Sequence, residues 1–326
     1  MNEVLENVLN WIYSWLGNYG WSMVVFTLLI RLVLFPFDYK SRVGMRKMSK
    51  IGPMQQALQK KYANDKETLN RKLGELYRKE RVNPLSSCLP MLLTLPIMFA
   101  MWGALRTIAN EQLAIQAFDI LMGKTPQIQG WLWVKNIWMP DSPFAALMPD
   151  LGSLQQITGP VWQKVYDSLG AAASALPQTI TYDFSQAALQ TTIRSMYDTM
   201  VALPAYAEAV SLLPGGTFNF LITTVSVMRE MNGWFVLPVL AAVTSYLQSA
   251  MNPAPKPAEG QGAANGNFMK WFFPLFSLWI CSGYNAAFSL YWVASNVIAA
   301  GEMWLINMYL DHKEKRETTV GEGSVR

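Results

Sequence analysis

Five apolar stretches dominate the sequence, each close to the length that a bilayer-spanning helix needs. Such a helix supplies roughly 20 mostly apolar residues to cross a hydrocarbon core of about 30 Å. The stretches are residues 20–38, 86–106, 234–251, 268–284 and 286–309, of which the third and fourth are short. Only 15% of the residues are charged and 52% are apolar, so a soluble protein is a poor alternative. We predict an all-α membrane protein with five transmembrane helices.

The distribution of basic residues predicts the orientation of these helices. Half of the chain's 26 Lys and Arg residues lie between Lys40 and Arg81, between the first two apolar stretches. Short loops rich in Lys and Arg stay on the cytoplasmic side. The 39–83 segment is therefore expected in the cytoplasm, with the N-terminus outside and the C-terminus inside. The long 107–233 loop then lies outside.

The segments between the spans have patterns of their own. Residues 1–19 alternate apolar and polar side chains at helical spacing, which predicts an amphipathic helix on the outer membrane surface. Residues 39–83 predict a cytoplasmic helical hairpin that turns at Ala63-Asn64-Asp65 and is kinked at Pro53. A functional hairpin and a solvated charged hairpin that merely connects two spans fit the sequence equally well. The 252–267 loop is rich in Pro and Gly and should be flexible, and 310–326 forms a cytoplasmic tail.

Arg31 is the sharpest single signal because it lies inside the first apolar stretch. An arginine near the bilayer centre costs at least about 2.5–3.5 kcal/mol, so such a residue usually faces a polar cavity. The alternative is snorkelling towards Asp38, seven residues and about 10 Å further along the helix. Thr27, one turn before Arg31, favours a polar stripe, but the sequence leaves both interpretations open.

Other spans carry small polar stripes. Thr244 and Gln248 are four residues apart in the third span, and Ser289, Trp292 and Asn296 share a face of the fifth. If these faces converge with Arg31, the helices enclose a water-accessible groove with one positive charge. The alternative is ordinary hydrogen bonding between helices, worth about 0.6 kcal/mol per contact.

Catalytic and metal-binding residues have little support in the sequence. Cys88 and Cys281 lie in apolar runs without metal-ligand spacing, and the single histidine, His312, lies in the charged tail. No nucleotide-binding or hydrolase motif is present. We therefore predict no enzyme activity and no cofactor. No Lys or Arg precedes Arg31, which argues against a secretory signal peptide.

Several motifs together resemble the YidC family of the Oxa insertase superfamily. The similar segments cover roughly residues 5–145 and 234–310. They include Gly20-Trp21-Ser22, Phe35-Pro36, Met45-Arg46-Lys47-Met48, Lys61-Tyr62, the run from Leu76 to Pro90, Leu275-Phe276-Ser277-Leu278 and the run from Leu290 to Asn296. As an ordered set these motifs are highly specific.

The resemblance implies a five-helix core with a hydrophilic groove open to the cytoplasm and to lipid. Arg31, Thr27, Gln248 and Trp292 match groove positions of the family, and the charged hairpin would receive substrates. The implied function is a membrane protein insertase and chaperone of the bacterial cytoplasmic (inner) membrane that works without nucleotide hydrolysis. Its partners would be nascent membrane proteins and the lipid bilayer, with no specific nucleic acid. Participation of a Sec translocon or the ribosome stays open.

The sequence also departs from the family pattern. Ser282-Gly283-Tyr284-Asn285 replaces the usual Pro-containing turn, and the large outer domain, extra leading helix and lipoprotein cysteine of some members are not found. About 80 residues, 151–232, are inserted after a segment like Trp138-Met139-Pro140-Asp141. Helical stretches around 160–175, 185–202 and 204–213 predict a small outer cap. A small anionic-solute transporter is the rival function, but the internal repeats typical of transporters are not evident.

Overall fold

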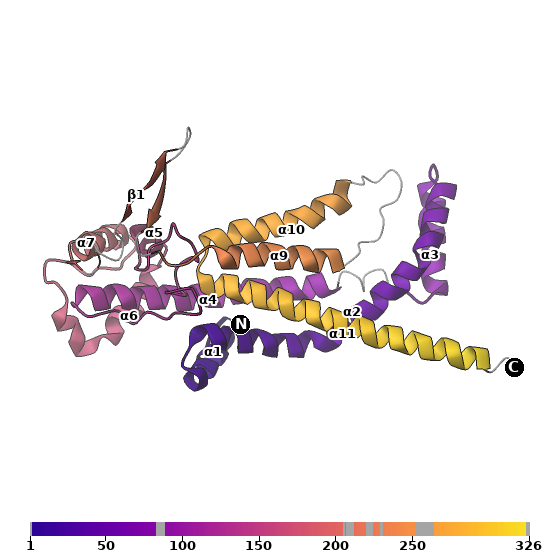
Figure 1. Ribbon diagram of the computed structural model, residues 1–326, viewed down its shortest axis with the longest axis horizontal. Helices are drawn as coiled ribbons and strands as arrows, with labels where there is room; N and C mark the ends of the chain where they lie inside the picture. Colours follow the sequence, from indigo (N-terminus) through magenta and orange to yellow (C-terminus); the bar gives the residue numbers. More distant parts are fainter. Residues whose placement is uncertain are drawn as a thin grey trace. The chain divides into compact units, whose positions relative to one another are not determined.

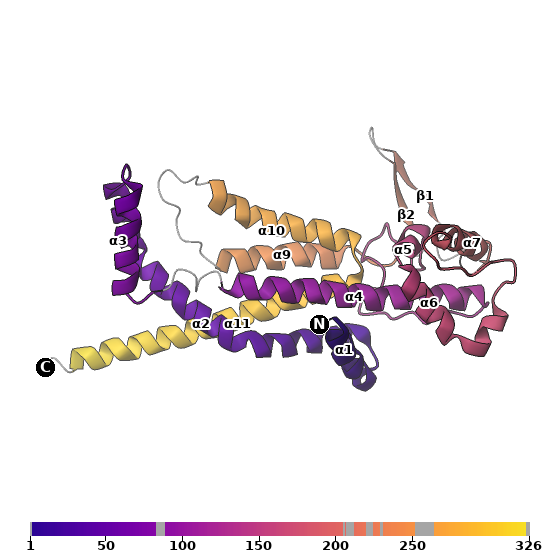
Figure 2. The ribbon, with the colours of Figure 1, turned by 180° about the vertical axis from the view of Figure 1, so that it is seen from behind.

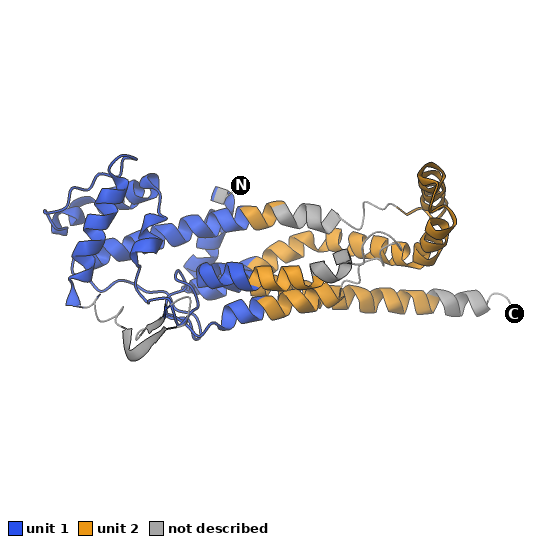
Figure 3. Ribbon diagram, turned by 90° about the horizontal axis from the view of Figure 1, so that it is seen from above, with its two compact units in different colours: residues 1–26, 100–241, 278–292 blue, residues 27–99, 242–277, 293–326 orange. Residues whose placement is uncertain are grey.

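A computed structural model describes residues 2–82, 89–204, 206, 212–219, 224–228, 231–251 and 264–323. The chain is predominantly helical (Figure 1), which confirms the predicted α class. The residues cluster into two compact units (Figure 3). Unit 1 comprises residues 1–26, 100–241 and 278–292, and unit 2 comprises residues 27–99, 242–277 and 293–326. Each unit is described separately below.

The longer helices are α1 (Asn2–Leu16), α2 (Tyr19–Lys61), α3 (Lys66–Lys79), α4 (Leu89–Leu121), α9 (Val236–Met251), α10 (Ala264–Gly283) and α11 (Ala286–Gly323). The inserted segment contributes α5 (Leu151–Gln155), α6 (Gly159–Ser168), the 3₁₀ helix η2 (Gly170–Ala175), α7 (Leu189–Val201) and the strands β1 (Leu212–Asn219) and β2 (Thr224–Met228).

The core of unit 1 is built on the second half of α4. Phe118 is fully buried and contacts the Trp162 ring of α6 edge-on, with 5.5 Å between ring centroids, while Trp162 stacks on Phe184. Gly159 allows this close approach, because a Cβ there would lie 2.4 Å from the Phe184 carbonyl oxygen. Helix α4 thus continues to Leu121 instead of giving way to a loop at 107 as expected, since its extension is covered by protein.

The inserted segment is not wholly helical. Strands β1 and β2 pair antiparallel, with Thr217 opposite Ser226 and Phe218 opposite Val225 (Figure 2). The helical stretch predicted at 204–213 is wrong at its end, because residues 212–213 belong to β1, and 207–211 lie outside the described residues. The Gly215-Gly216 pair disfavours a helix and falls where the strand register shifts, as glycines at bulges do.

Helix α1 presents apolar side chains on two faces. Leu9 and Ile12 are buried in unit 1. A second stripe is exposed: Val4, Val8, Trp11 and Trp15. The outward stripe contains two large aromatic side chains in edge contact, which is the composition expected of a helix at the membrane surface.

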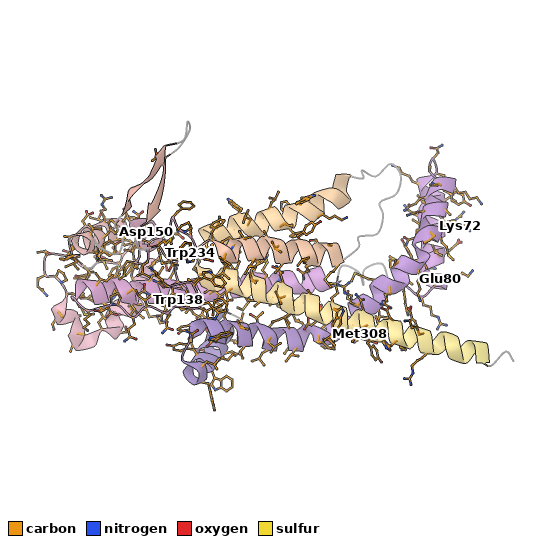
Figure 4. The ribbon with its side chains drawn as sticks, in the orientation of Figure 1. Lys72, Glu80, Trp138, Asp150, Trp234 and Met308 are labelled. Carbon is orange, nitrogen blue, oxygen red and sulfur yellow. The ribbon has the colours of Figure 1, made fainter. Side chains whose placement is uncertain are left out.

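In unit 2, α2 continues without a break into the first arm of the hairpin. Pro36 and Pro53 each remove one backbone hydrogen bond, yet neither ends the helix. The α2 helix ends at Lys61, and Asp65 caps α3 by accepting a hydrogen bond from the Thr68 N–H. Lys72 and Glu80 mark α3 and its C-terminal cap in Figure 4.

Helices α9 and α10 lie side by side within unit 2 (Figures 1 and 2). Most of the predicted flexible loop, 252–263, lies outside the described residues. Helix α11 continues past the predicted end of the span at 309 to Gly323. Among the described residues, α2 alone is long and apolar enough to cross a membrane, with a mean hydropathy of 1.9 over an 18-residue window. Helix α9 is a shorter apolar helix.

Candidate polar groove residues

The Arg31 side chain is almost completely buried, with 8% of its surface exposed. Its Nη2 donates a hydrogen bond of 2.7 Å to the Ser295 hydroxyl of α11. Its Nη1 lies 3.9 Å from an Asp38 carboxylate oxygen, two turns further along α2. The guanidinium therefore has a polar partner on α11 and an anionic partner on α2. The Ser295 contact agrees with a polar site between helices, and the Asp38 contact agrees with snorkelling along α2.

A second carboxylate belongs to the same neighbourhood. Glu302 lies on α11 two turns after Ser295 and interacts electrostatically with both Arg31 and Asp38. Arg42 in turn interacts with Asp38. We call Arg31, Asp38, Arg42, Ser295 and Glu302 the Arg31 cluster. Sequence analysis missed Ser295 and Glu302, although an acidic residue inside a predicted span was a signal available for Glu302.

Two further predicted groove residues belong to unit 2. Thr27 is buried one turn before Arg31, with 1% of its surface exposed. Gln248 is half-buried on α9, one turn after Thr244. Both positions keep the helical spacing on which their prediction rests.

Asn296, by contrast, joins helices. Its amide nitrogen donates to the Ser245 hydroxyl (2.9 Å) and to the Thr244 hydroxyl (3.2 Å), both on α9. Ser245 bonds Ser277 of α10 at 2.8 Å, and Ser277 donates to the Phe273 carbonyl. This chain connects α9, α10 and α11 through buried hydroxyls. The alternative of ordinary interhelical hydrogen bonding therefore describes Asn296 well.

Ser289 and Trp292 belong to unit 1. The buried Ser289 hydroxyl donates to the carbonyl oxygens of Cys281 and Asn285, at 3.2 and 3.4 Å, and so braces the turn between α10 and α11. Trp292 is half-buried and packs against Phe288, with 5.7 Å between ring centroids. The three residues of the polar stripe in the fifth span thus make different contacts: Ser289 bonds backbone carbonyls, Trp292 packs against an aromatic ring and Asn296 bonds hydroxyls of α9.

An ionic network that the sequence did not predict lies between α2 and the C-terminal half of α11. Arg46 pairs with Asp311 and donates to the Asn307 carbonyl oxygen at 3.0 Å. Lys50 pairs with Glu314 at 2.9 Å. Lys50, Asp311 and Glu314 are exposed and the Arg46 side chain is 25% exposed, so solvent screens these pairs and each contributes only about 0–1 kcal/mol.

No metal site is evident in the part of the chain that the structure describes. No group of three or more His, Cys, Asp or Glu side chains there is placed to hold a metal ion.

Comparison with known proteins places the chain in a family. A family model described as 60Kd inner membrane protein matches residues 11–314. The chain belongs to this family. Its curated relatives of the 60Kd family include the Membrane protein insertase YidC of Campylobacter jejuni, 31% identical over 53% of this chain and 35% of the relative.

Other relatives bear the same printed name. The Fusobacterium nucleatum protein is 43% identical over 33% of this chain and 52% of its own length, and the Chlorobaculum tepidum protein is 23% identical over 94% of this chain and 36% of its own length. The matched regions thus span about half or less of these relatives.

Proposed function

We propose that this chain is a membrane protein insertase of the bacterial cytoplasmic membrane. Five helices would span the bilayer, N-terminus outside and C-terminus inside, at 20–38, 86–106, 234–251, 268–284 and 286–309. The 39–83 hairpin and the tail would face the cytoplasm, and the 107–233 segment with its insert would lie outside. The insertase name of the relatives and the basic hairpin support this proposal.

The observation that carries the proposal is the nearly complete burial of Arg31 in the apolar α2 helix. An arginine there is costly unless polar groups or water accompany it. We propose that Arg31, Thr27 and Gln248 line a hydrophilic groove that admits the polar tail or short loop of a nascent membrane protein. Trp292 is a groove candidate through the family resemblance.

The groove would act by lowering a free-energy barrier. A polar segment crosses apolar lipid only at high cost because its backbone and side chains lose their hydrogen bonds to water. Groove hydroxyls, the Gln248 amide and the Arg31 guanidinium would replace part of that hydration. Transfer of the client's apolar segment into lipid would drive the reaction, so no nucleotide is needed.

The test is insertion of a small client with a short outer tail into liposomes containing the purified protein. Arg31→Ala is expected to lower the yield about tenfold, equivalent to roughly 1.4 kcal/mol, and Arg31→Lys to restore part of it. The control is Arg194→Ala, which removes an exposed guanidinium paired with Asp198 on the insert. Unchanged insertion with both Arg31 variants would refute the groove. Lost anion flux with intact insertion would indicate a transporter instead.

A further inference from the structure

Arg31 has two carboxyl groups as neighbours inside the protein. Asp38 forms an ion pair with it, and Glu302 adds a second carboxylate within electrostatic range. Arg42, which faces Asp38, adds a second positive charge. The Arg31 cluster thus contains two guanidinium and two carboxyl groups. An incoming acidic residue would therefore not meet an isolated positive charge.

The contacts within the cluster are unequal. The bond to the Ser295 hydroxyl is 2.7 Å long, whereas the closest contact to Asp38 is 3.9 Å. Charge-assisted hydrogen bonds between a guanidinium and a carboxylate are about 2.7–2.9 Å long. Asp38 is thus within ion-pair range of Arg31 but outside that hydrogen-bond distance. A carboxylate from another molecule that met the guanidinium at this hydrogen-bond distance would form a shorter contact than the internal one.

A guanidinium has the donors for such a replacement. Arg has five N–H groups in a fixed planar fork that binds carboxylates with two parallel hydrogen bonds. Ser295 accepts a hydrogen bond from Nη2 and so fixes the fork from the α11 side. Exchanging one carboxylate for another also avoids leaving the buried Arg31 without an anion at any stage, which would be the costly state.

We propose that Asp38 and Glu302 are exchangeable counter-ions of Arg31 that set which clients the groove prefers. A client carboxylate takes the place of the internal ones while its segment crosses, and the internal pair re-forms when the client leaves for the lipid. The two internal carboxylates thereby set how strongly the groove favours clients with acidic tails or loops over neutral ones. This inference rests on the proposed insertase function.

The experiment compares two clients that differ only in charge. One carries a short outer tail with two Asp residues, and the other carries Asn at both positions. Each is inserted into liposomes containing the full-length protein, and the protease-protected tail is quantified. The measured quantity is the ratio of acidic to neutral insertion. Asp38→Asn with Glu302→Gln is expected to raise this ratio at least threefold, because Arg31 then lacks internal competitors.

Glu314→Gln is the matched control, since it removes an exposed carboxylate from the same helix without touching the Arg31 cluster. It is expected to leave the ratio at the wild-type value. Insertion of the neutral client reports whether a variant is folded. If the double variant inserts it poorly, Glu302→Gln alone is used, with a smaller rise in the ratio expected.

The outcomes separate this inference from the function on which it rests. A ratio that stays constant or falls in the double variant and in Glu302→Gln overturns the counter-ion role. The insertase function then still stands if Arg31→Ala selectively impairs the acidic client. If Arg31→Ala changes the insertion of neither client, the groove mechanism and the counter-ion role fail together.

Discussion

Asp141→Ala should be among the most damaging single substitutions in unit 1. The carboxylate is fully buried and accepts hydrogen bonds from the Leu237 N–H (2.7 Å), the Phe235 N–H (3.2 Å) and the Trp133 indole N–H (3.0 Å). Leu237 lies in the first turn of α9, so the negative charge also interacts favourably with the positive end of the dipole of that helix. The carboxylate thus fastens the start of α9 to the segment that precedes the insert.

The surrounding contacts show how closely this site is fitted. A Cβ at Gly233 would lie 2.0 Å from an Asp141 oxygen, and Phe235 adopts a positive φ of 65° beside it. Nearby, the buried Asn232 amide donates to the Asn136 and Pro140 carbonyl oxygens, both at 2.8 Å. The two chain segments that flank the insert are therefore joined by buried hydrogen bonds. Trp138 and Trp234 mark these segments in Figure 4.

The expected cost follows from these contacts. A hydrogen bond to a charged group contributes about 1.5–3 kcal/mol, and a buried donor left without a partner costs about 1–3 kcal/mol. The donors around Asp141 act together and relax in part, so we expect a loss of about 3–5 kcal/mol, at the high end for single substitutions. For a chain of 326 residues, whose unfolding entropy is about 0.7 kcal/mol per degree, that loss lowers the thermal midpoint by about 4–7 °C.

Thermal unfolding of the detergent-solubilised full-length protein measures this loss, with protease cleavage between 142 and 231 as a local probe. Asp167→Ala is the control, because that carboxylate is exposed and accepts a side-chain hydrogen bond from Gln163 on its own helix. Asp141→Asn, which retains one acceptor oxygen, should fall between the two. A midpoint for Asp141→Ala no lower than that of the control would refute the reasoning.

Two predictions concern α1. Burial, and then the nearby Glu111 charge, raise the pKa of Glu6 above its usual 4.5. The folded state therefore binds the proton more tightly than the unfolded state, and the free energy of unfolding falls as the pH rises from 4.5 through the raised pKa. Glu6→Gln should therefore raise the thermal midpoint at pH 7 but not below about pH 4.5, and an equal gain at both pH values would contradict this origin. The second prediction is that the exposed stripe contacts lipid. Trp15→Phe should then reduce the part of the tryptophan fluorescence that brominated lipids quench, whereas Trp138→Phe, whose ring is buried, should leave that part unchanged. An equal change in quenched fluorescence for the two variants would mean that the stripe lies in water.

The sequence predicted the helical class and the family, because apolar length, basic-residue distribution and an ordered set of motifs are local features. It named Asp38 in one of two interpretations of Arg31, but it did not predict the hydrogen bond to Ser295. Asp38 was visible as a neighbour on the same helix, but Ser295 is 264 positions away in the chain. Which turn of one helix meets which turn of another depends on packing, and periodicity alone does not provide that register.

Helix ends were also hard to predict, for a related reason. Hydropathy indicates which residues lipid could cover, so the apolar stretch predicted that the second span ends at 106. Helix α4 continues to Leu121 because protein covers its extension: Ala114, Ala117 and Phe118 are fully buried. The hairpin of β1 and β2 escaped notice because Gly215 and Gly216 suggest a loop when they are read without a partner strand.

The polar residues of the apolar helices divide according to how completely the protein satisfies them. The Asn296 amide donates at 2.9 and 3.2 Å to hydroxyls on α9, and a client group could compete only by breaking hydrogen bonds that join helices. Arg31 has one short bond and a carboxylate at 3.9 Å. A buried charge with a loose internal partner has more to gain from a new partner than a satisfied amide has. By this criterion Arg31 is suited to exchanging its partner for a client group, and Asn296 is suited to holding helices together. Both are polar residues in apolar helices, so the sequence pattern alone does not distinguish them.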